Sequence, residues 1–154
     1  MKKHFTATAY IVSKVEGELK VLLHKHKKLN IWIAIGGHVE GENPYQTVLR
    51  EVKEETNLDI KVISEDKKLL KIKDVEQIFA PTVIIEETIP AYRDEPPHIH
   101  IDCIYITFCK KPKKLKIDAE FAWVSKKDVK KMKLGKEVIY LLNKLFKLKV
   151  LKSI

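Results

Sequence analysis

The sequence is poor in several residue types, and each shortage excludes something. Its 154 residues include two cysteines, five glycines and two arginines, and no apolar run approaches the ~20 residues of a membrane span. Cys103 and Cys109 stand six residues apart in an apparent strand. That spacing separates them by roughly 20 Å, which is too far for a disulfide. We therefore expect reduced cysteines, no membrane partner and a cytoplasmic protein.

Acidic residues are outnumbered by basic ones, 21 to 30, except in one stretch. The formal net charge is +9 and comes almost wholly from lysine. Such a charge is typical of a solvated surface, and it also attracts polyanions such as nucleotides or RNA ends. Residues 36–58 reverse this sign, because five glutamates against Arg50 and Lys53 leave a net charge of −3. An acidic segment in a basic protein suggests that a cation binds there.

The order of the predicted elements indicates one domain, residues 1–154, of the α/β class. The length suits a single core, and strands mixed with helices favour layers packed around one sheet. The connection at 65–74 is rich in lysine, and 90–98 is a loop punctuated by prolines. Runs rich in β-branched and apolar residues predict strands at 4–15, 18–26, 31–35, 59–64, 75–79, 82–89, 99–109 and 119–125.

Two longer helices are predicted. Asn43 is a good N-cap, and Pro44 suits the first turn of a helix that runs through about Thr56. Its core side would carry Tyr45, Val48, Leu49 and Val52. Ser125 is predicted to cap a short basic helix. An amphipathic helix follows, with Val138, Ile139, Leu141, Leu142, Leu145 and Phe146.

Three glutamates of the first predicted helix share one face. Glu51, Glu54 and Glu55 stand at i, i+3 and i+4, so their carboxylates repel one another without a compensating charge. Mg²⁺ or Mn²⁺ would supply it, because hard cations prefer carboxylate oxygens. Arg50 stands four residues before Glu54 and can orient one carboxylate. The alternative is an exposed acidic helix with ordinary ion pairs.

The spacing of these residues resembles the signature of the Nudix hydrolase family. The signature is Gly-x5-Glu-x7-Arg-Glu-U-x-Glu-Glu-x-Gly-U, where U is an aliphatic residue. Gly36, Glu42 and the segment REVKEETNL match each fixed position, except that Asn57 replaces the last glycine. This resemblance implies an α/β/α sandwich in which a mixed sheet lies between the catalytic helix and the C-terminal helix.

The same resemblance implies an enzyme that hydrolyses a diphosphate linkage. Its substrate would be a small nucleotide of the type nucleoside diphosphate bonded to another group, such as an NTP, a dNTP or a nucleotide sugar, and its cofactor would be Mg²⁺ or Mn²⁺. The metal ligands would be Gly36, Glu51, Glu54, Glu55 and, as an extra ligand, Glu120. Catalysis would depend on Glu51, Arg50 and Glu54. Glu51 is the first candidate for the general base, and Glu120 is the second.

Two departures from the signature concern geometry. Asn57 stands where glycine would adopt a left-handed conformation, and asparagine is the next-best residue there. We therefore expect the same helix end. The glycine loop is also one residue shorter than the common form, and Gly36 rather than Gly37 meets the strict spacing. We assign the metal-facing carbonyl to Gly36.

Three ring side chains are candidates for substrate binding: Trp32, His38 and His100. Trp32 either stacks on a base or belongs to the core, and His38 in the glycine loop can reach phosphate. His98 and His100 alternate along a predicted strand and point to one face. Zinc binding by that pair is the lesser alternative to substrate or solvent contact, since no third histidine stands near them in the sequence. The lysine-rich segment 110–116 indicates a solvated turn.

Alternatives to a small-molecule nucleotide hydrolase stay open. The positive charge favours an RNA 5′-end pyrophosphohydrolase. A non-catalytic nucleotide-binding regulatory module would have no physical need for three clustered carboxylates. An isomerase of allylic diphosphates would call for a cysteine near residues 36–58, and the chain has none there. Exposed strand edges leave a homodimer open.

Overall fold

A mixed eight-stranded sheet forms the centre of the protein. The computed structural model describes residues 1–64, 69–115 and 120–154, and expectations on 65–68 and 116–119 lie outside that range. The sheet has the order β3-β2-β1-β7-β5, while β4 also pairs with β1, β6 with β7 and β8 with β2. β1 and β7 are parallel, and the other pairs are antiparallel. The strands are β1 Lys3–Val15, β2 Glu18–His26, β3 Ile31–Ile33, β4 Ile35–His38, β5 Ile60–Val62, β6 Val83–Ile89, β7 His98–Cys109 and β8 Phe121–Val124.

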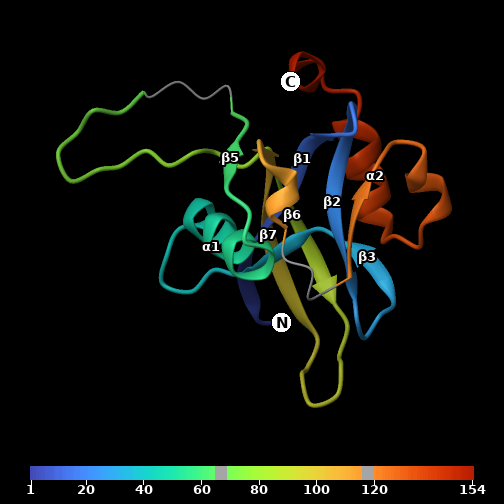
Figure 1. Ribbon diagram of the computed structural model, residues 1–154. Coiled ribbons are helices and arrows are strands. Elements are labelled where there is room, and N and C mark those ends of the chain that lie inside the picture. The colour runs from blue at the N-terminus through green and yellow to red at the C-terminus, as the bar shows by residue number, and fades with distance from the viewer. Residues whose placement is uncertain (65–68, 116–119) are drawn as a thin grey trace.

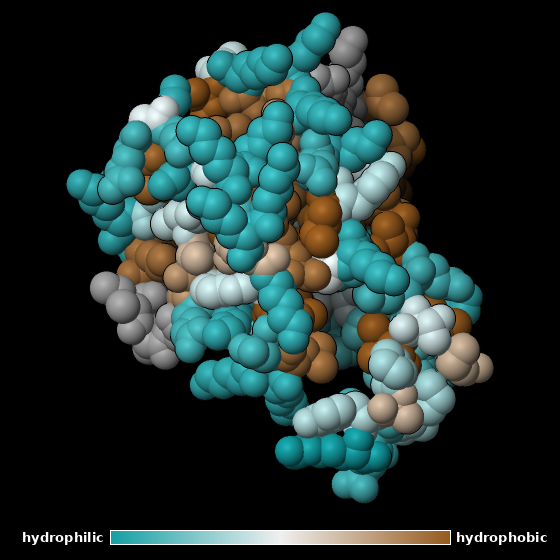
Figure 2. Space-filling model, turned by 90° about the vertical axis from the view of Figure 1, so that its right-hand side faces the viewer, coloured by the Kyte–Doolittle hydropathy of each residue, from teal (hydrophilic) through white to brown (hydrophobic). Residues whose placement is uncertain are grey.

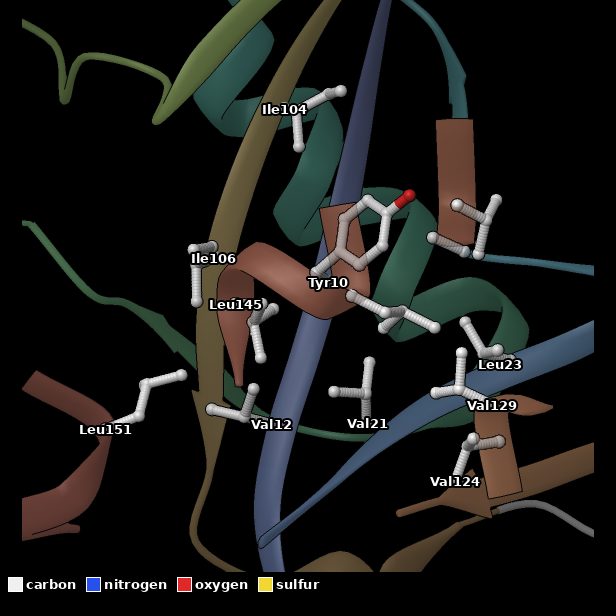
Figure 3. Close-up of a cluster of buried hydrophobic side chains, with 13 residues drawn as sticks. Tyr10, Val12, Val21, Leu23, Ile104, Ile106, Val124, Val129, Leu145 and Leu151 are labelled. Carbon is white, nitrogen blue, oxygen red and sulfur yellow. The ribbon is translucent and has the colours of Figure 1, made fainter. Parts of the chain in front are cut away.

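Helices cover both faces of the sheet (Figure 1): α1 (Pro44–Thr56) on one and α2 (Lys136–Leu145) on the other. Successive residues of β1 point to opposite faces. Ala9 and Ile11 share a buried cluster with α1, and Tyr10 and Val12 share one with α2. Figure 3 shows Tyr10 and Val12 beside Leu145 of α2. The predicted α/β/α sandwich is therefore confirmed.

Local sequence determines both ends of α1. The Asn43 side chain accepts a hydrogen bond from the Gln46 N–H, and the Gln46 side chain accepts one from the Asn43 N–H. Pro44 occupies the first turn. At the other end Asn57 has φ 60°, and its N–H donates to the Lys53 carbonyl. The left-handed helix end predicted for Asn57 is confirmed.

The core sides of the helices differ in part from the prediction. In α1, Val48 and Val52 are fully buried, but Leu49 is only half-buried. In α2, Leu142 is buried, whereas Ile139 remains 38% exposed. The sheet covers a narrower stripe of each helix than the run of apolar residues suggests.

The predicted cap at Ser125 is wrong. The short helix Asp128–Lys131 begins after Lys127 and has no side-chain cap. Instead the N–H and the hydroxyl of Ser125 both donate to the Asp128 carboxylate, at 2.8 and 2.7 Å. The Asp128 carboxylate is a strong acceptor, so the Ser125 hydroxyl donates to it, and the Asp128 backbone N–H donates to the Ser125 carbonyl at 3.1 Å.

The glycines belong to a strand rather than a loop, which corrects the sequence-based expectation. The predicted strand 31–35 divides at Ala34: β3 pairs with β2, and β4 pairs with β1. Gly36 and Gly37 lie opposite Thr8 and Ala7 in this second pairing. The chain thus changes partner just before it reaches the acidic helix, and β1 sets the position of the glycines.

The strand predicted at 75–79 is absent. Residues 69–80 run outward from the sheet and back (Figure 1), and they contain an isolated bridge between Ile72 and Val75. The apolar pattern failed as a signal because a strand also needs a partner. One edge of β7 pairs with β1. The other edge already pairs with β6 over His98–Ile104 and with β5 over Thr107–Cys109.

The molecular surface is mainly hydrophilic on the side seen in Figure 2, with smaller hydrophobic areas between the polar side chains. Within the described part of the chain, no helix is long and apolar enough to cross a membrane. Cys103 and Cys109 are free, as predicted from their spacing, and both are buried.

Candidate functional site

The carboxylates of the acidic segment converge on Arg50. Its guanidinium donates to Glu42 Oε1 at 2.9 and 2.7 Å, to Glu51 Oε1 at 2.7 Å and to Glu54 Oε2 at 3.3 Å. The Glu42 and Glu51 side chains are only 20% and 16% exposed, whereas Glu54 is 60% exposed. The sequence predicted that Arg50 orients one carboxylate. In the structure it fixes two firmly and contacts a third.

The two glycines of β4 have different neighbours. A Cβ at Gly36 would collide with the backbone of β1 at Ala7 and Thr8. Close pairing of these strands therefore requires glycine. A Cβ at Gly37 would instead overlap the Glu51 carboxylate. The backbone of β4 thus lies directly against one of the predicted metal ligands.

Glu55 is the most perturbed carboxyl of the acidic cluster Glu51, Glu54 and Glu55. Burial, and then the charges of Glu51 and Glu54, raise its pKa to about 7. His24 Nδ1 lies 3.9 Å from Glu55 Oε2. Burial lowers the pKa of His24, so this ring supplies little positive charge at neutral pH. The cluster therefore carries negative charge that the side chains around Glu55 do not neutralise, and such surroundings favour a divalent cation.

Glu120 lies beside this cluster, although it is far from it in the sequence. It lines a hollow of about 460 Å³ together with Glu55, His24 and Lys25. Its side chain is 68% exposed, and one carboxylate oxygen lies 3.4 Å from Lys25 Nζ. The pairing of β8 with β2 places Glu120 here, because the Lys25 N–H donates to the Glu120 carbonyl.

A groove of about 510 Å³ adjoins that hollow, and His24 and His26 line both. Asp102 of β7 lies in the groove and accepts hydrogen bonds from the hydroxyls of Thr6 and Thr8, at 2.9 and 3.0 Å. Burial raises the pKa of Asp102. No role for Asp102 was predicted from the sequence, because the two threonines reach it only through the parallel pairing of β1 with β7. The walls of the groove include the apolar residues Ile31, Ile33, Ile85, Ile89 and Leu141.

His38 and His100, both predicted to contact substrate, line this groove. Their rings lie 5.1 Å apart, edge to face. Burial, followed by the neighbouring His38, His98 and His4, lowers the pKa of His100 to about 4. His100 is therefore neutral near pH 7. The sequence did not single out His4, and the pairing of β1 with β7 brings it opposite His100.

Trp32 lies apart from these groups. Its ring packs against the buried cluster under α2, and the backbone N–H of Trp32 donates to the Lys133 carbonyl at 2.9 Å. Of the two interpretations of Trp32, base stacking or core packing, this position favours the core.

Comparison with known proteins identifies the family. The sequence matches the NUDIX domain family over residues 2–143. A comparison with curated proteins gave no match. A NUDIX-family hydrolase from Clostridium perfringens is 26% identical, with a TM-score of 0.73 over 92% of this chain and 94% of its own.

Two more distant structures share the fold. The Ap4A hydrolase of C. elegans, solved as a binary complex, is 21% identical, with a TM-score of 0.63 over 98% of this chain and 99% of its own. The NUDIX domain of Shewanella oneidensis NrtR, solved with ADP ribose, is 19% identical, with a TM-score of 0.53 over 93% and 86%. From the match that covers nearly the whole chain, we conclude that this protein belongs to the Nudix family and is a hydrolase of pyrophosphate bonds.

Proposed function

We propose that the protein hydrolyses a diphosphate linkage in a nucleoside diphosphate bonded to another group, with Mg²⁺ or Mn²⁺ as cofactor. The observation that carries this proposal is the convergence of Glu51, Glu54 and Glu55, with Arg50 and Gly37 fixing the Glu51 carboxylate. An exposed acidic helix with ordinary ion pairs would not need a glycine pressed against one of its carboxylates.

The donor set fits a hard divalent cation. All side-chain donors are carboxylate oxygens, and burial followed by the charges of Glu51 and Glu54 raises the pKa of Glu55. In this proposal the ligands are the Gly36 carbonyl, Glu51, Glu54 and Glu55, and Glu120 is a further ligand from the other side of the hollow. A bound cation would neutralise the diphosphate and lower the pKa of the attacking water.

The roles of the remaining groups follow from their positions. Arg50 orients Glu51, and Glu51 accepts the proton of the attacking water. The 2.7 Å contact with Arg50 and the backbone of Gly37 restrict the Glu51 carboxylate, which favours it over the exposed Glu120 as the general base. Glu54, which is 60% exposed, keeps room for an incoming ligand.

The groove beside this cluster suits the nucleoside part of a substrate. Apolar walls with a few fixed polar groups are typical of small-molecule sites. Asp102 is held by two threonine hydroxyls and can accept a hydrogen bond from a base or ribose. His38 and His100 line the same groove and are proposed to contact the substrate.

Turnover of a nucleotide panel tests the proposal. The panel contains NTPs, dNTPs, ADP-ribose, nucleotide sugars, dinucleoside polyphosphates and 5′-triphosphate RNA, each with Mg²⁺ and with Mn²⁺. We expect metal-dependent release of phosphate, pyrophosphate or a mononucleotide. The Glu54→Gln/Glu55→Gln variant should lose roughly 10²–10³-fold, because several kcal/mol of transition-state stabilisation depend on the metal.

A matched control separates lost ligands from lost negative charge. Glu16 and Glu18 are exposed residues at the β1–β2 turn, away from the acidic helix. The Glu16→Gln/Glu18→Gln variant removes the same charge and should hydrolyse like the unmodified protein. Nucleotide binding without turnover on any panel member would contradict the proposal and favour a regulatory binding module.

Positive charge near the acidic cluster favours RNA 5′ ends as a second substrate class. Lys25 and Lys27 line the hollow beside Glu55, and the whole chain carries a formal net charge of +9. Cleavage of 5′-triphosphate RNA in preference to free NTPs would identify RNA as the substrate class. Turnover that declines steeply with salt would support the same conclusion.

A further inference from the structure

Four histidines from three strands meet at one end of the sheet. They are His4 near the start of β1, His38 at the end of β4, and His98 and His100 at the start of β7. Strand register brings them together: His4 is paired with His100, and Thr6, two residues after His4, is paired with His38. No third histidine stands near His98 and His100 in the sequence, but the fold brings His4 and His38 beside them.

Ring nitrogens of three of these histidines form one close group, and the fourth histidine contacts one of the three. Ligand atoms of His4, His38 and His100 all lie within 4.8 Å of one another. His98 Nε2 lies 3.1 Å from His100 Nε2. A tetrahedral zinc ion with Zn–N bonds of about 2.0–2.1 Å needs nitrogens about 3.3 Å apart. Small rotations of side chains that are at most half-buried would therefore bring the other nitrogens into range.

The hydrogen bonding of His98 already has the form that metal-bound histidines show. Its Nδ1 lies 3.0 Å from the Pro96 carbonyl. A carbonyl can only accept, so Nδ1 carries the proton and Nε2 presents a lone pair toward His100. Ligating histidines commonly donate their other N–H to a carbonyl or a carboxylate in this way, which fixes the ring and its tautomer.

We propose that His4, His38, His98 and His100 bind one divalent transition-metal ion of the zinc type. Imidazole nitrogen is a donor that suits Zn²⁺, Co²⁺, Ni²⁺ and Cu²⁺, whereas Mg²⁺ prefers oxygen. The site is thus chemically distinct from the carboxylate cluster of α1. It goes beyond the proposed hydrolysis and does not depend on it.

The surroundings of the four histidines suit a cation. Glu40 and Glu95 line a hollow of about 790 Å³ together with His4, His38 and His98. Lys2 lines the same hollow, so these three side chains together leave a net charge of −1 beside the histidines. Strands hold all four ligands, and sites built on strands keep their geometry better than sites on loops. Because His38 and His100 also line the groove, an ion here would lie at the edge of the substrate site.

Zinc binding by the chain without a histidine tag tests this proposal. Calorimetric titration of the Glu54→Gln/Glu55→Gln variant with Zn²⁺, in excess Mg²⁺, excludes the carboxylate cluster from the result. We expect one Zn²⁺ per chain. The imidazole nitrogen signals of the four histidines should shift together in NMR spectra, and Co²⁺ should give the visible absorption of a tetrahedral, nitrogen-bound ion.

Removal of ligands completes the test. On the same background, His4→Gln/His98→Gln should weaken zinc binding by at least about 10–100-fold, which is the cost of losing even an outer-sphere partner. His26→Gln, a histidine on β2 outside the cluster, should bind zinc as before. Circular dichroism verifies that each variant is folded.

Three results would overturn the site: no zinc bound once the carboxylates are replaced, an affinity unchanged by His4→Gln/His98→Gln, or the same loss in His26→Gln. None of them bears on the hydrolysis proposal, because turnover with Mg²⁺ or Mn²⁺ is a separate measurement.

Discussion

The carboxylate cluster of α1 and the histidine cluster at the end of the sheet are built by opposite means. Glu51, Glu54 and Glu55 lie within five residues of one helix, so helical periodicity alone brings them together. His4 and His100 are 96 residues apart and become neighbours only because β1 pairs with β7. A cluster of residues close together on one helix can therefore be predicted from the sequence alone. A cluster that depends on which strands pair, and in what register, cannot.

The two clusters are nevertheless adjacent, and β4 joins them. Gly37 touches the Glu51 carboxylate, and the next residue, His38, belongs to the histidine cluster. The Arg50 guanidinium also reaches the His38 carbonyl, at 3.4 Å. Changes in α1 should still affect hydrolysis far more than zinc binding, because none of the four histidine ligands lies on α1.

Among single substitutions, the largest effect is expected from Arg50→Ala. Glu51 and Glu42 would lose the cation that fixes them, and a misplaced carboxylate costs on the order of 10²-fold in kcat/KM. The measurement is steady-state hydrolysis of the best substrate of the panel. Arg93→Ala is the matched control, since Arg93 is the other arginine and lies on the β6–β7 loop. Full activity of Arg50→Ala would show that the carboxylates position themselves.

Gly37→Ala and Gly36→Ala should separate catalysis from folding. The Cβ at Gly37 displaces a side-chain end that can move, so we expect roughly a 10–100-fold loss of kcat and a nearly unchanged Tm. The Cβ at Gly36 strikes the β1 backbone, and overpacking of that kind costs about 1–3 kcal/mol of folding free energy. Thermal unfolding and kinetics of both variants decide the matter. An equal loss of stability in Gly36→Ala and Gly37→Ala would contradict the view that Gly36 serves folding and Gly37 serves catalysis.

Glu55→Gln should stabilise the metal-free protein at pH 8. Burial and the neighbouring glutamates raise the Glu55 pKa to about 7. Between the ordinary pKa of 4.5 and that value, the folded state retains a proton that the unfolded state loses. The free energy of unfolding therefore falls as pH rises through this window, and the penalty is complete above it.

Removing that charge should recover roughly 1 kcal/mol after allowance for solvent screening, or about 2–4 °C in Tm. Scans at pH 8 and at pH 4 measure it in the presence of a chelator. The gain should vanish at pH 4, where the carboxyl is protonated in both states. A gain of equal size at both pH values would mean that charge is not its cause.

The smallest effects concern the end of α1. Asn57 has φ 60°, where a Cβ without a polar group costs about 1 kcal/mol. Asn57→Ala should lower stability by that amount, and Asn57→Gly should change it by only a few tenths of a kcal/mol. Denaturant titration of both variants provides the comparison. Both Asn57 variants should bind zinc like the unmodified protein, since none of the four histidines lies on α1.

The sequence predicted what short-range rules control. Asn43, Pro44 and Asn57 define α1 through hydrogen bonds and backbone preferences within a few residues, and both predicted ends are confirmed. The predicted strand at 75–79 failed for the complementary reason. Its apolar residues satisfy the local rule, but a strand also needs a partner. One edge of β7 pairs with β1, and the other edge is already paired with β5 and β6.

The sequence by itself therefore determined the family, the acidic helix and the kind of ion that its carboxylates favour, because helical spacing makes neighbours of nearby residues. Only the tertiary structure decided that Gly37 presses on Glu51, that Thr6 and Thr8 hold Asp102, and that four histidines meet beside the groove. Those contacts depend on which strands pair and in what register, and hydrogen bonds between distant segments fix that register.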